Sequence, residues 1–301
     1  MYKVIIALLI LLPLTLSAKT KKDTIRVFYL GGQSNMDGYG YCKDLPDSLD
    51  KKFKDVYIFH GNPVGDNQSG GGLGLWDNLK PGHGVKFSSD GKNNTLSQRF
   101  GVELSFAKRL QEMFPGEKIA LIKYSKGGTS IDSSMARNFG CWEPDFIGTN
   151  GLNQYDHCLQ TIKQAMFTRD INNDGVEDVL IPSGIIWMQG ESDATTEECA
   201  SRYYANLKRL MDLLRAAFLK DDLPVVVGKI SDSWKDSDGK VWECGELIQY
   251  AQEKFAKTDS NTSIVRDTRY YKYSDKWHYN NEGYIHLGAR FADEVYKLLT
   301  E

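Results

Sequence analysis

Four short segments of this chain carry the residue types that acyl-transfer chemistry uses. GGQSNM (31–36) contains Ser34, SKGGTSI (125–131) contains a glycine pair, WMQGESD (187–193) contains a glutamine and acids, and SDKWH (274–278) ends in a histidine. A serine hydroxyl becomes a nucleophile when a neighbouring base removes its proton and an acid orients that base. GGQSNM alone is also typical of a polar turn, so its role depends on the other three segments.

His278 is the candidate base, because histidine is the usual proton acceptor for a serine near neutral pH. Asp275 lies three residues before it, a spacing that lets a carboxylate in a turn reach the imidazole and fix its tautomer. Glu191 is the alternative acid: it either accepts from His278 in place of Asp275 or binds backbone amides of its own loop. Spacing does not decide between the two, and a lone DxxH also fits a helix cap beside a surface histidine.

Three of these segments offer N–H groups for a developing oxyanion. The glycines before Ser34 permit a turn that would expose its hydroxyl and its N–H. Gly127 and Gly128 let the backbone approach a substrate closely, and Gln189 follows an apolar run, where its amide adds a side-chain donor. Two or three donors aimed at one oxygen are what an acyl-transfer site needs.

The elements that must position these segments alternate between strands and helices. Apolar, β-branched runs predict strands at 24–30, 118–125, 180–189, 224–231 and 262–267, with a weaker candidate at 56–60. Helical periodicity covers 102–114, 151–167, 197–219, 245–257 and 281–299. This order predicts a mostly parallel sheet with helices on both faces, and such sheets bind ligands at the carboxyl ends of their strands. The Gly-rich segment 61–97 is predicted to be a long loop that forms a lid or a wall of the site.

Length and composition favour one large domain. The 301 residues are 41% apolar and 26% charged, with a net charge of -3 and no basic block, so nucleic acid and anionic membrane surfaces have no support as partners. The five cysteines form no CxxC pair, which gives no support to a zinc or thioredoxin-type site. Residues 1–18 have the plan of a secretory signal peptide. We therefore predict a periplasmic or secreted protein whose residues 19–301 form a single domain, with no membrane contact after cleavage.

A separate motif, TRDINNDGVED (168–178), resembles the opening of a calcium loop. Its oxygen-bearing side chains are those of Asp170, Asn172, Asp174 and Asp178. The closing acid of an EF-hand would fall at position 181, which is an isoleucine, so a full EF-hand is excluded. A shorter structural calcium loop and an unmetallated Asx-type turn both remain open. In either case the motif precedes the strand at 180–189 and lies away from the chemistry.

Taken together, GQSNM, KGGTSI, WMQGESD and DKWH, in that order, resemble the sialate O-acetylesterase-type domain of the SGNH hydrolase superfamily. Carbohydrate esterase family 6, which includes acetylxylan esterases, shares the pattern. The resemblance covers most of residues 25–300. It implies a flavodoxin-like three-layer α/β/α sandwich with a mostly parallel sheet, and the removal of O-acetyl groups from carbohydrates without a catalytic cofactor.

The resemblance also implies roles for individual residues. Ser34 matches the nucleophile, His278 the base and Asp275 the acid, while Glu191 matches a glutamate that some members use as the acid. The oxyanion donors would be the N–H groups of Ser34 and Gly128 and the amide of Gln189, where the wider superfamily usually has asparagine. The neighbouring residues expected to contact the substrate are Gln33, Asn35, Gly127 and Trp277. Glu103 fits a glutamate that the family tends to carry at the start of its first long helix.

The predicted substrate is an acetylated oligosaccharide or glycan of the sialic acid or xylan type. Three other readings compete with this one. A glycosidase would pair Glu191 with Asp275 or Asp193, but it leaves GQSNM and His278 unexplained. A non-catalytic glycan-binding module would have a broken triad, whereas every required residue type is present. A lipid esterase or thioesterase would need a more apolar entrance than the segment 61–97 suggests.

Overall fold

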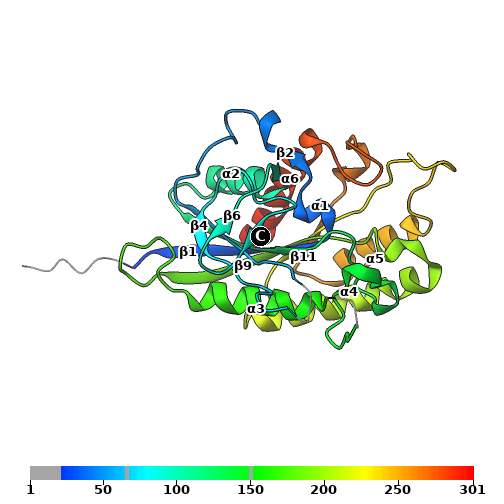
Figure 1. Cartoon of the computed structure of the whole chain (residues 1–301), viewed down its shortest axis with the longest axis horizontal. Helices are drawn as coiled ribbons and strands as arrows, with labels where there is room; N and C mark the ends of the chain where they lie inside the picture. The colour runs from blue at the N-terminus through cyan, green and yellow to red at the C-terminus, as the bar shows by residue number, and fades with distance from the viewer. Residues whose placement is uncertain (1–21, 65–67, 149–151) are drawn as a thin grey trace, which may run out of the picture.

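A seven-stranded sheet lies between two layers of helices (Figure 1). The computed structural model describes residues 22–64, 68–148 and 152–301. The strand order is β11-β10-β9-β1-β8-β3-β4, and only β4 runs antiparallel to its neighbour, β3. The strands of this sheet are β1 (Thr24–Gly32), β3 (Val56–His60), β4 (Trp76–Asn78), β8 (Lys118–Ser125), β9 (Val179–Met188), β10 (Val225–Gly228) and β11 (Thr262–Val265).

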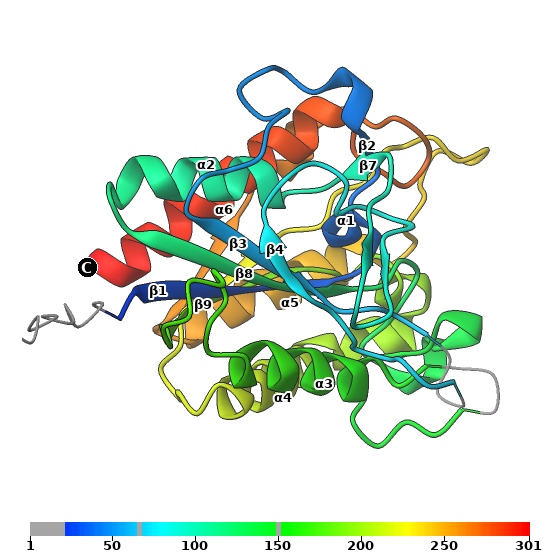
Figure 2. The ribbon, with the colours of Figure 1, turned by 60° about the vertical axis from the view of Figure 1, so that its left-hand side comes forward.

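Helices α2 and α6 cover one face of the sheet, and α3 and α4 cover the other, with α5 packed against α4 (Figures 1 and 2). The helices are α1 (Ser34–Asp37), α2 (Glu103–Met113), α3 (Gln154–Phe167), α4 (Glu197–Ala217), α5 (Gly245–Thr258) and α6 (Asn281–Thr300). Two small ribbons pair β2 (Gly40–Tyr41) with β7 (Arg99–Phe100), and β5 (Ser88–Ser89) with β6 (Asn94–Thr95). Single 3₁₀ turns occupy residues 42–44, 133–135, 137–139, 193–195 and 267–270.

The predicted fold class is confirmed, and every predicted strand and helix has a counterpart in the structure. β10 ends at Gly228, earlier than predicted, because the N–H of Ile230 donates to the side chain of Gln252 on α5 instead of to a neighbouring strand. The segment 61–97 is less irregular than predicted. It contributes β4, which pairs with the exposed edge of β3, and the indole N–H of Trp76 donates to the carbonyl of Ala165 on α3.

Side-chain caps mark where three long helices begin. The side chain of Asn153 accepts from the N–H of residue 156 at the start of α3, and the hydroxyl of Thr196 accepts from the N–H of residue 199 at the start of α4. Asn280 does the same for α6, accepting from the N–H of Gly283 at 3.0 Å. Each cap satisfies a backbone donor that the first helical turn leaves free, so each helix begins where its capping residue stands.

The predicted signal peptide, residues 1–18, lies outside the described residues and stays a prediction. No helix in the described part of the chain has the length and apolar character needed to cross a bilayer. The five cysteines, all within that part, are free thiols.

A buried ion pair lies beneath the carboxyl ends of the strands. The ammonium group of Lys123, on β8, and the carboxylate of Glu103, at the start of α2, are both fully buried and 2.9 Å apart. The same ammonium donates to the backbone carbonyls of Asp37 and His83 at 2.9 and 2.7 Å. Glu103 also accepts from the N–H of Gly101. One charged pair therefore joins β8, α1, α2 and the loop around His83.

We expect Glu103→Gln to lower the free energy of unfolding by about 3–5 kcal/mol, because it leaves the buried ammonium of Lys123 without a counter-charge. Urea unfolding of both proteins measures this difference. The matched control is Glu112→Gln, which removes an exposed partner of Lys108 and Arg109 and should cost about 1 kcal/mol or less. Equal losses in the two variants would contradict the importance given to the buried pair.

Candidate active site

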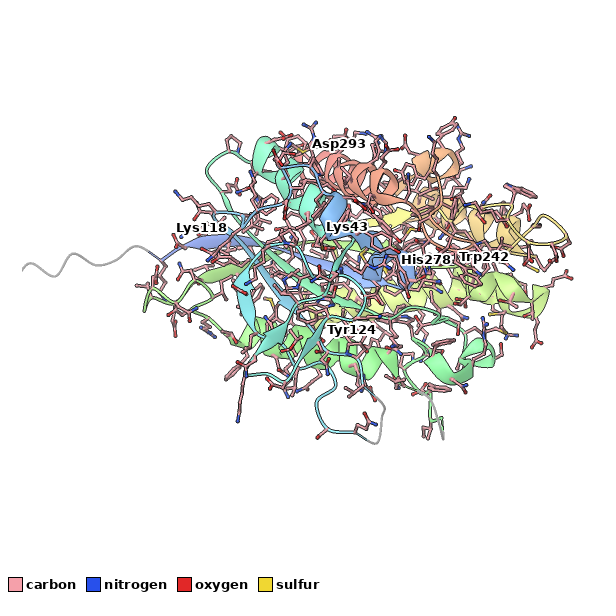
Figure 3. All side chains as sticks on the ribbon, turned by 45° about the horizontal axis from the view of Figure 1, so that its top comes forward. Lys43, Lys118, Tyr124, Trp242, His278 and Asp293 are labelled. Carbon is pink, nitrogen blue, oxygen red and sulfur yellow. The ribbon has the colours of Figure 1, made fainter. Side chains whose placement is uncertain are left out.

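A cavity of about 400 Å³ opens where β1, β8 and β9 end. The strand register places Gly32 opposite both Ser125 and Met188, so the segments that follow the three strands start at the same level. Residues of all four chemistry-bearing segments line the cavity: Gln33, Ser34, Lys126, Gly127, Gly128, Ser192, Trp277 and His278. Figure 3 shows His278 at this end of the molecule, close to Trp242. The structure therefore brings together segments that are far apart in the sequence.

Gly32 produces the turn that presents Ser34. Its φ is +142°, and a Cβ added there would lie 2.0 Å from the carbonyl oxygen of Met188, so only glycine fits. The chain then enters α1 at Ser34, whose side chain is almost buried but lines the cavity. No hydrogen bond links the Ser34 hydroxyl to His278 among the described residues. Such contacts often tighten only when substrate binds.

Asp275 holds His278 through both its backbone and its side chain. Oδ2 of Asp275 lies 2.7 Å from Nδ1 of the imidazole, and Oδ1 accepts from the N–H groups of Trp277 and His278 at 2.7 and 2.8 Å. The ring of Tyr39 stacks on the imidazole with centroids 3.6 Å apart and planes within 6°. With Nδ1 engaged, Nε2 is the ring nitrogen left for the cavity that His278 lines.

The charge on Asp275 is favoured by these contacts. Partial burial would by itself raise the pKa of the carboxyl, but the hydrogen bonds from the His278 side chain and from the two backbone N–H groups outweigh it. The pKa of Asp275 is therefore lowered, and the group is an anion at neutral pH.

The side chain of Asn35 lies between Glu191 and the loop that carries His278. Oε1 of Glu191 accepts from the side-chain amide of Asn35 at 2.8 Å, and its Oε2 is buried without a hydrogen-bond partner. Burial is the main cause that raises the pKa of Glu191. The same Asn35 amide donates to the carbonyl of Trp277, and its oxygen accepts from the hydroxyl of Tyr284 at 2.9 Å. Among the described residues, the hydrogen bonds that link Glu191 to the loop carrying His278 therefore run through Asn35.

The amide of Gln189 faces away from the cavity. Its Nε2 donates to Oδ2 of Asp193 at 2.5 Å and to the carbonyl of Thr129 at 3.1 Å, and its Oε1 accepts from the hydroxyl of Tyr203. The carboxylate of Asp193 also accepts from the N–H of Ile131. Burial raises the pKa of Asp193 to about 6, although these donors oppose it. Gln189 and Asp193 therefore brace the loop after β8, and both amide hydrogens of Gln189 are already in use.

The side chain of Gln33 binds the loop that follows β9. Its Oε1 accepts from the N–H groups of Gly190 and Ser192 at 3.3 and 3.2 Å. Its Nε2 has no hydrogen-bond partner among the described residues and is not one of the fully buried unpartnered atoms, so it reaches the cavity that Gln33 lines. Gly127 lies against the nucleophile candidate, since a Cβ added there would be 3.3 Å from the Cβ of Ser34.

Several residues of the cavity wall were not among the site residues predicted from the sequence. They are Asp37, Tyr39, Val85, Arg137, Phe139 and Trp242. Asp37 and Tyr39 follow Ser34 closely, so the continuation of the first motif pointed toward them. The pKa of Asp37 is raised to about 6, mainly by burial, with the charges of Lys123 and Lys126 acting in the opposite direction. Trp242 lies in the loop that follows the strand predicted at 224–231, but far from the end of that strand.

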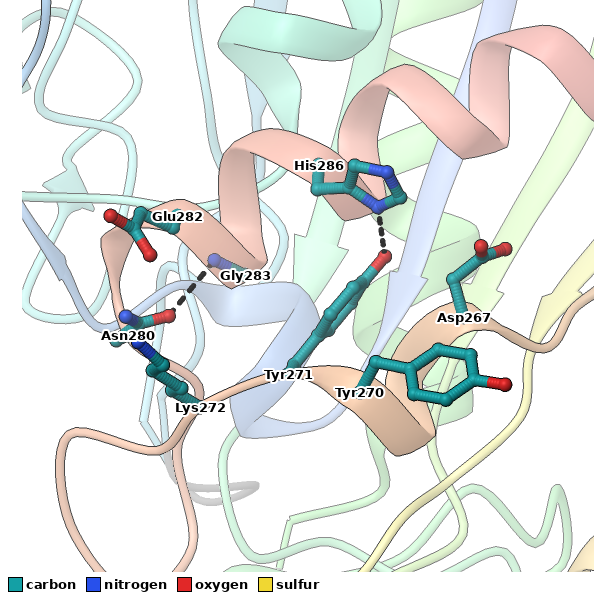
Figure 4. A pocket seen from close by; sticks show the side chains of 8 residues that line it. All are labelled: Asp267, Tyr270, Tyr271, Lys272, Asn280, Glu282, Gly283 and His286. Carbon is teal, nitrogen blue, oxygen red and sulfur yellow. Dashed lines mark hydrogen bonds between the residues drawn. The ribbon is translucent and has the colours of Figure 1, made fainter.

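A different cavity of about 350 Å³ lies at the start of α6, away from the four segments (Figure 4). Its side chains include Tyr271, whose hydroxyl lies 2.8 Å from Nδ1 of His286, and Asn280, which caps α6. It contains no serine or cysteine among its lining residues. His286 is an exposed residue of α6 whose hydrogen-bond partner is the hydroxyl of Tyr271.

The predicted calcium loop folds onto its own backbone. Asp170 accepts from the N–H groups of residues 174 and 175, Asn172 accepts from the N–H of Asp174, and Asp178 accepts from the N–H of Ile171. Across the described residues there is no group of three or more His, Cys, Asp or Glu side chains placed to hold a metal. These hydrogen bonds are the contacts of an Asx-type turn, and the structural calcium that the sequence left open stays a prediction.

Comparisons with known proteins agree with this fold. A structure from Arabidopsis thaliana is 19% identical with a TM-score of 0.62, covering 91% of this chain and 98% of its own. A carbohydrate acetylesterase from Xanthomonas citri is 17% identical with a TM-score of 0.59, covering 92% of this chain and 56% of its own. NanS is 16% identical with a TM-score of 0.58, covering 92% of this chain and 98% of its own. A comparison with curated protein sequences gave no match.

A comparison with protein families defines the class of this protein as a carboxylic ester hydrolase. The model of one family, "Carbohydrate esterase, sialic acid-specific acetylesterase", matches residues 24–297. The chain belongs to this family, and its expected substrate is a carbohydrate.

Proposed function

We propose that this chain is an exported serine esterase that removes O-acetyl groups from carbohydrates, with Ser34, His278 and Asp275 as its triad. The observation that carries the proposal is the pairing of His278 Nδ1 with Asp275 at 2.7 Å beside a cavity that Ser34 also lines. Export rests on the N-terminal sequence alone. The family match supports the carbohydrate ester as substrate.

The reaction proceeds in two acyl-transfer steps. Nε2 of His278 takes the proton of the Ser34 hydroxyl as its oxygen attacks the acetyl carbonyl. The tetrahedral intermediate collapses when the imidazolium returns this proton to the departing sugar oxygen, which leaves an acetyl-enzyme. Water then attacks the acetyl group, giving its proton to His278, and acetate leaves as the proton passes back to Ser34. Asp275 keeps the imidazole oriented and stabilises its positive charge.

The oxyanion donors in this proposal are the N–H groups of Ser34 and Gly128 and the side-chain amide of Gln33. Gln189 was expected in the third role, but both of its amide hydrogens are bonded to Thr129 and Asp193. Gln33 has its oxygen anchored by two backbone N–H groups and its nitrogen unpaired. An anchored amide with a free donor costs little reorganisation when charge develops on the substrate.

The competing functions fit the site less well. A glycosidase needs two carboxylates that face the substrate. Here Glu191 is buried and accepts a hydrogen bond from Asn35, and Asp275 is hydrogen-bonded to His278, so neither carboxylate faces the cavity. For a lipid esterase, the wall carries Asp37, Lys126 and Arg137, whose charged groups suit a hydrated sugar better than an acyl chain.

We expect Ser34→Ala to lower acetate release by about 10⁴-fold or more, because it removes the nucleophile. The assay uses acetylated sialic acids, acetylated xylo-oligosaccharides and simple acetyl esters. Ser192→Ala is the matched control: this serine lines the same cavity and has no role in the reaction, so it should retain most activity. Undiminished turnover in Ser34→Ala would exclude the serine mechanism.

Exchanging each carboxylate for its amide separates the two candidate acids. Asp275→Asn should lower kcat by roughly 10³–10⁴-fold, since an amide no longer fixes the tautomer that exposes a basic Nε2. Glu191→Gln keeps an oxygen for Asn35 and should lower kcat by about 10-fold or less. Steady-state kinetics at several pH values provide the measurement. The assignment is wrong if Asp275→Asn stays near wild-type kcat while Glu191→Gln does not.

We expect substitutions of Gln33 to change kcat and substitutions of Gln189 to change Tm. Gln33→Glu keeps an oxygen for Gly190 and Ser192 but replaces the donor, so kcat should fall by about 10²-fold or more with little change in Tm. Gln189→Met should lower Tm while kcat per folded molecule stays within about 10-fold. Unchanged kcat in Gln33→Glu, or a hundredfold loss of kcat in Gln189→Met at wild-type Tm, would indicate that Gln189 and not Gln33 is the third oxyanion donor.

A further inference from the structure

A second cavity, of about 160 Å³, adjoins the active-site cavity. The two share Trp242, which lines both of them. The wall of the smaller cavity also contains Trp234, Lys240, Gln249 and Arg269. An aromatic side chain common to two cavities places any group in the second next to a ligand in the first.

One carboxylate organises the loop that carries both tryptophans. Asp232 accepts from the backbone N–H groups of Trp234, Val241 and Trp242 at 2.7, 3.0 and 2.8 Å. It thereby closes the loop between residues 232 and 242 on itself. Trp234 has a φ of +58°, a conformation that non-glycine residues rarely adopt. The hydrogen bonds of the loop therefore set the backbone position of Trp234, and 62% of this residue is exposed.

This loop is fastened to the loop that carries the catalytic histidine. The hydroxyl of Ser233 donates to the carbonyl of Lys276 at 2.7 Å, and the ammonium of Lys235 donates to the carbonyl of Tyr273 at 2.9 Å. Lys276 also forms an ion pair with Asp236. Trp242 and His278, both labelled in Figure 3, line the same cavity. The tryptophans of one loop thus have a fixed relation to the reacting groups of the other.

The exposed indole faces of two tryptophans are suited to binding a sugar ring. Trp234 and Trp277 are 62% and 47% exposed, although burying an indole is strongly favourable, so these faces are available to a ligand. A sugar ring offers an apolar face to such an indole and hydroxyl groups around its edge. Lys240, Gln249 and Arg269 supply polar groups around the second cavity, the combination of apolar surface with a few polar groups that is typical of ligand sites.

We propose that the second cavity is a subsite for the sugar unit next to the acetylated one, with Trp234 and Trp242 as its stacking surfaces. The substrate is then an oligosaccharide or glycan chain rather than a free monosaccharide. This inference rests on the proposed function, because it assumes that the acetylated sugar occupies the cavity lined by Ser34 and His278.

The test compares matched substrates that differ only in chain length. These are O-acetylated xylose with O-acetylated xylotetraose, and O-acetylated N-acetylneuraminic acid with O-acetylated sialyllactose. For at least one pair, the wild-type enzyme should show a higher kcat/KM on the longer substrate. Trp234→Ala should lower the ratio of the two kcat/KM values by about 10-fold through KM of the longer substrate. Trp234→Phe should recover part of that ratio.

The control is Tyr250→Ala, which removes another exposed aromatic side chain, 68% exposed, from a different cavity and should leave the ratio unchanged. An unaltered ratio in Trp234→Ala, or a wild-type preference for the monosaccharide in both pairs, would overturn the subsite and leave the esterase assignment standing. Absence of acetate release from every carbohydrate would overturn the proposed function itself.

Discussion

The buried ammonium group of Lys123 is the interaction on which the active-site end of the sheet depends. Its acceptors come from Glu103, Asp37 and His83, so α1, α2 and a long loop are linked to strand β8. Burial, and secondly this positive charge, lower the pKa of both His60 and His83, the latter to about 3. The two histidines therefore stay neutral, and Glu103 compensates the positive charge of Lys123.

Asn35 links the segment of Ser34, the proposed nucleophile, to the loop that carries His278. It follows Ser34 directly, and its side-chain amide contacts Glu191, the carbonyl of Trp277 and the hydroxyl of Tyr284. A movement of α1 would break hydrogen bonds to both the loop after β9 and the loop before α6. Asn35 was predicted to bind substrate, but its fully used amide is better suited to positioning. The hydrogen bonds of Asn35 therefore connect the segments of Ser34 and His278, which lie near opposite ends of the chain.

The fold was predictable because its strands are continuous apolar runs and its helices have clear periodicity, and the parallel order then placed Ser34, Gly128 and His278 at one edge. The direction of the Gln189 amide was not predictable. It depends on Thr129, Asp193 and Tyr203, which reach it from three other segments. Trp242 was missed for a related reason: its loop is held by the carboxylate of Asp232, and no periodic pattern marks such a loop as part of a site.

The two candidate acids differ most in what their surroundings do to their charge. During acyl transfer the imidazole becomes a cation, so an anion in direct contact stabilises the transition state. Asp275 meets this need because a three-residue turn gives it both a side-chain and two backbone donors, which lower its pKa. Glu191 is fully buried and its pKa is raised, but its contact with Asn35 needs only an accepting oxygen, which a carboxylic acid and a carboxylate both provide. Glu191 can therefore hold its loop in either protonation state. Asp275, whose pKa is lowered by its hydrogen bonds, is the acid that stays charged beside the histidine.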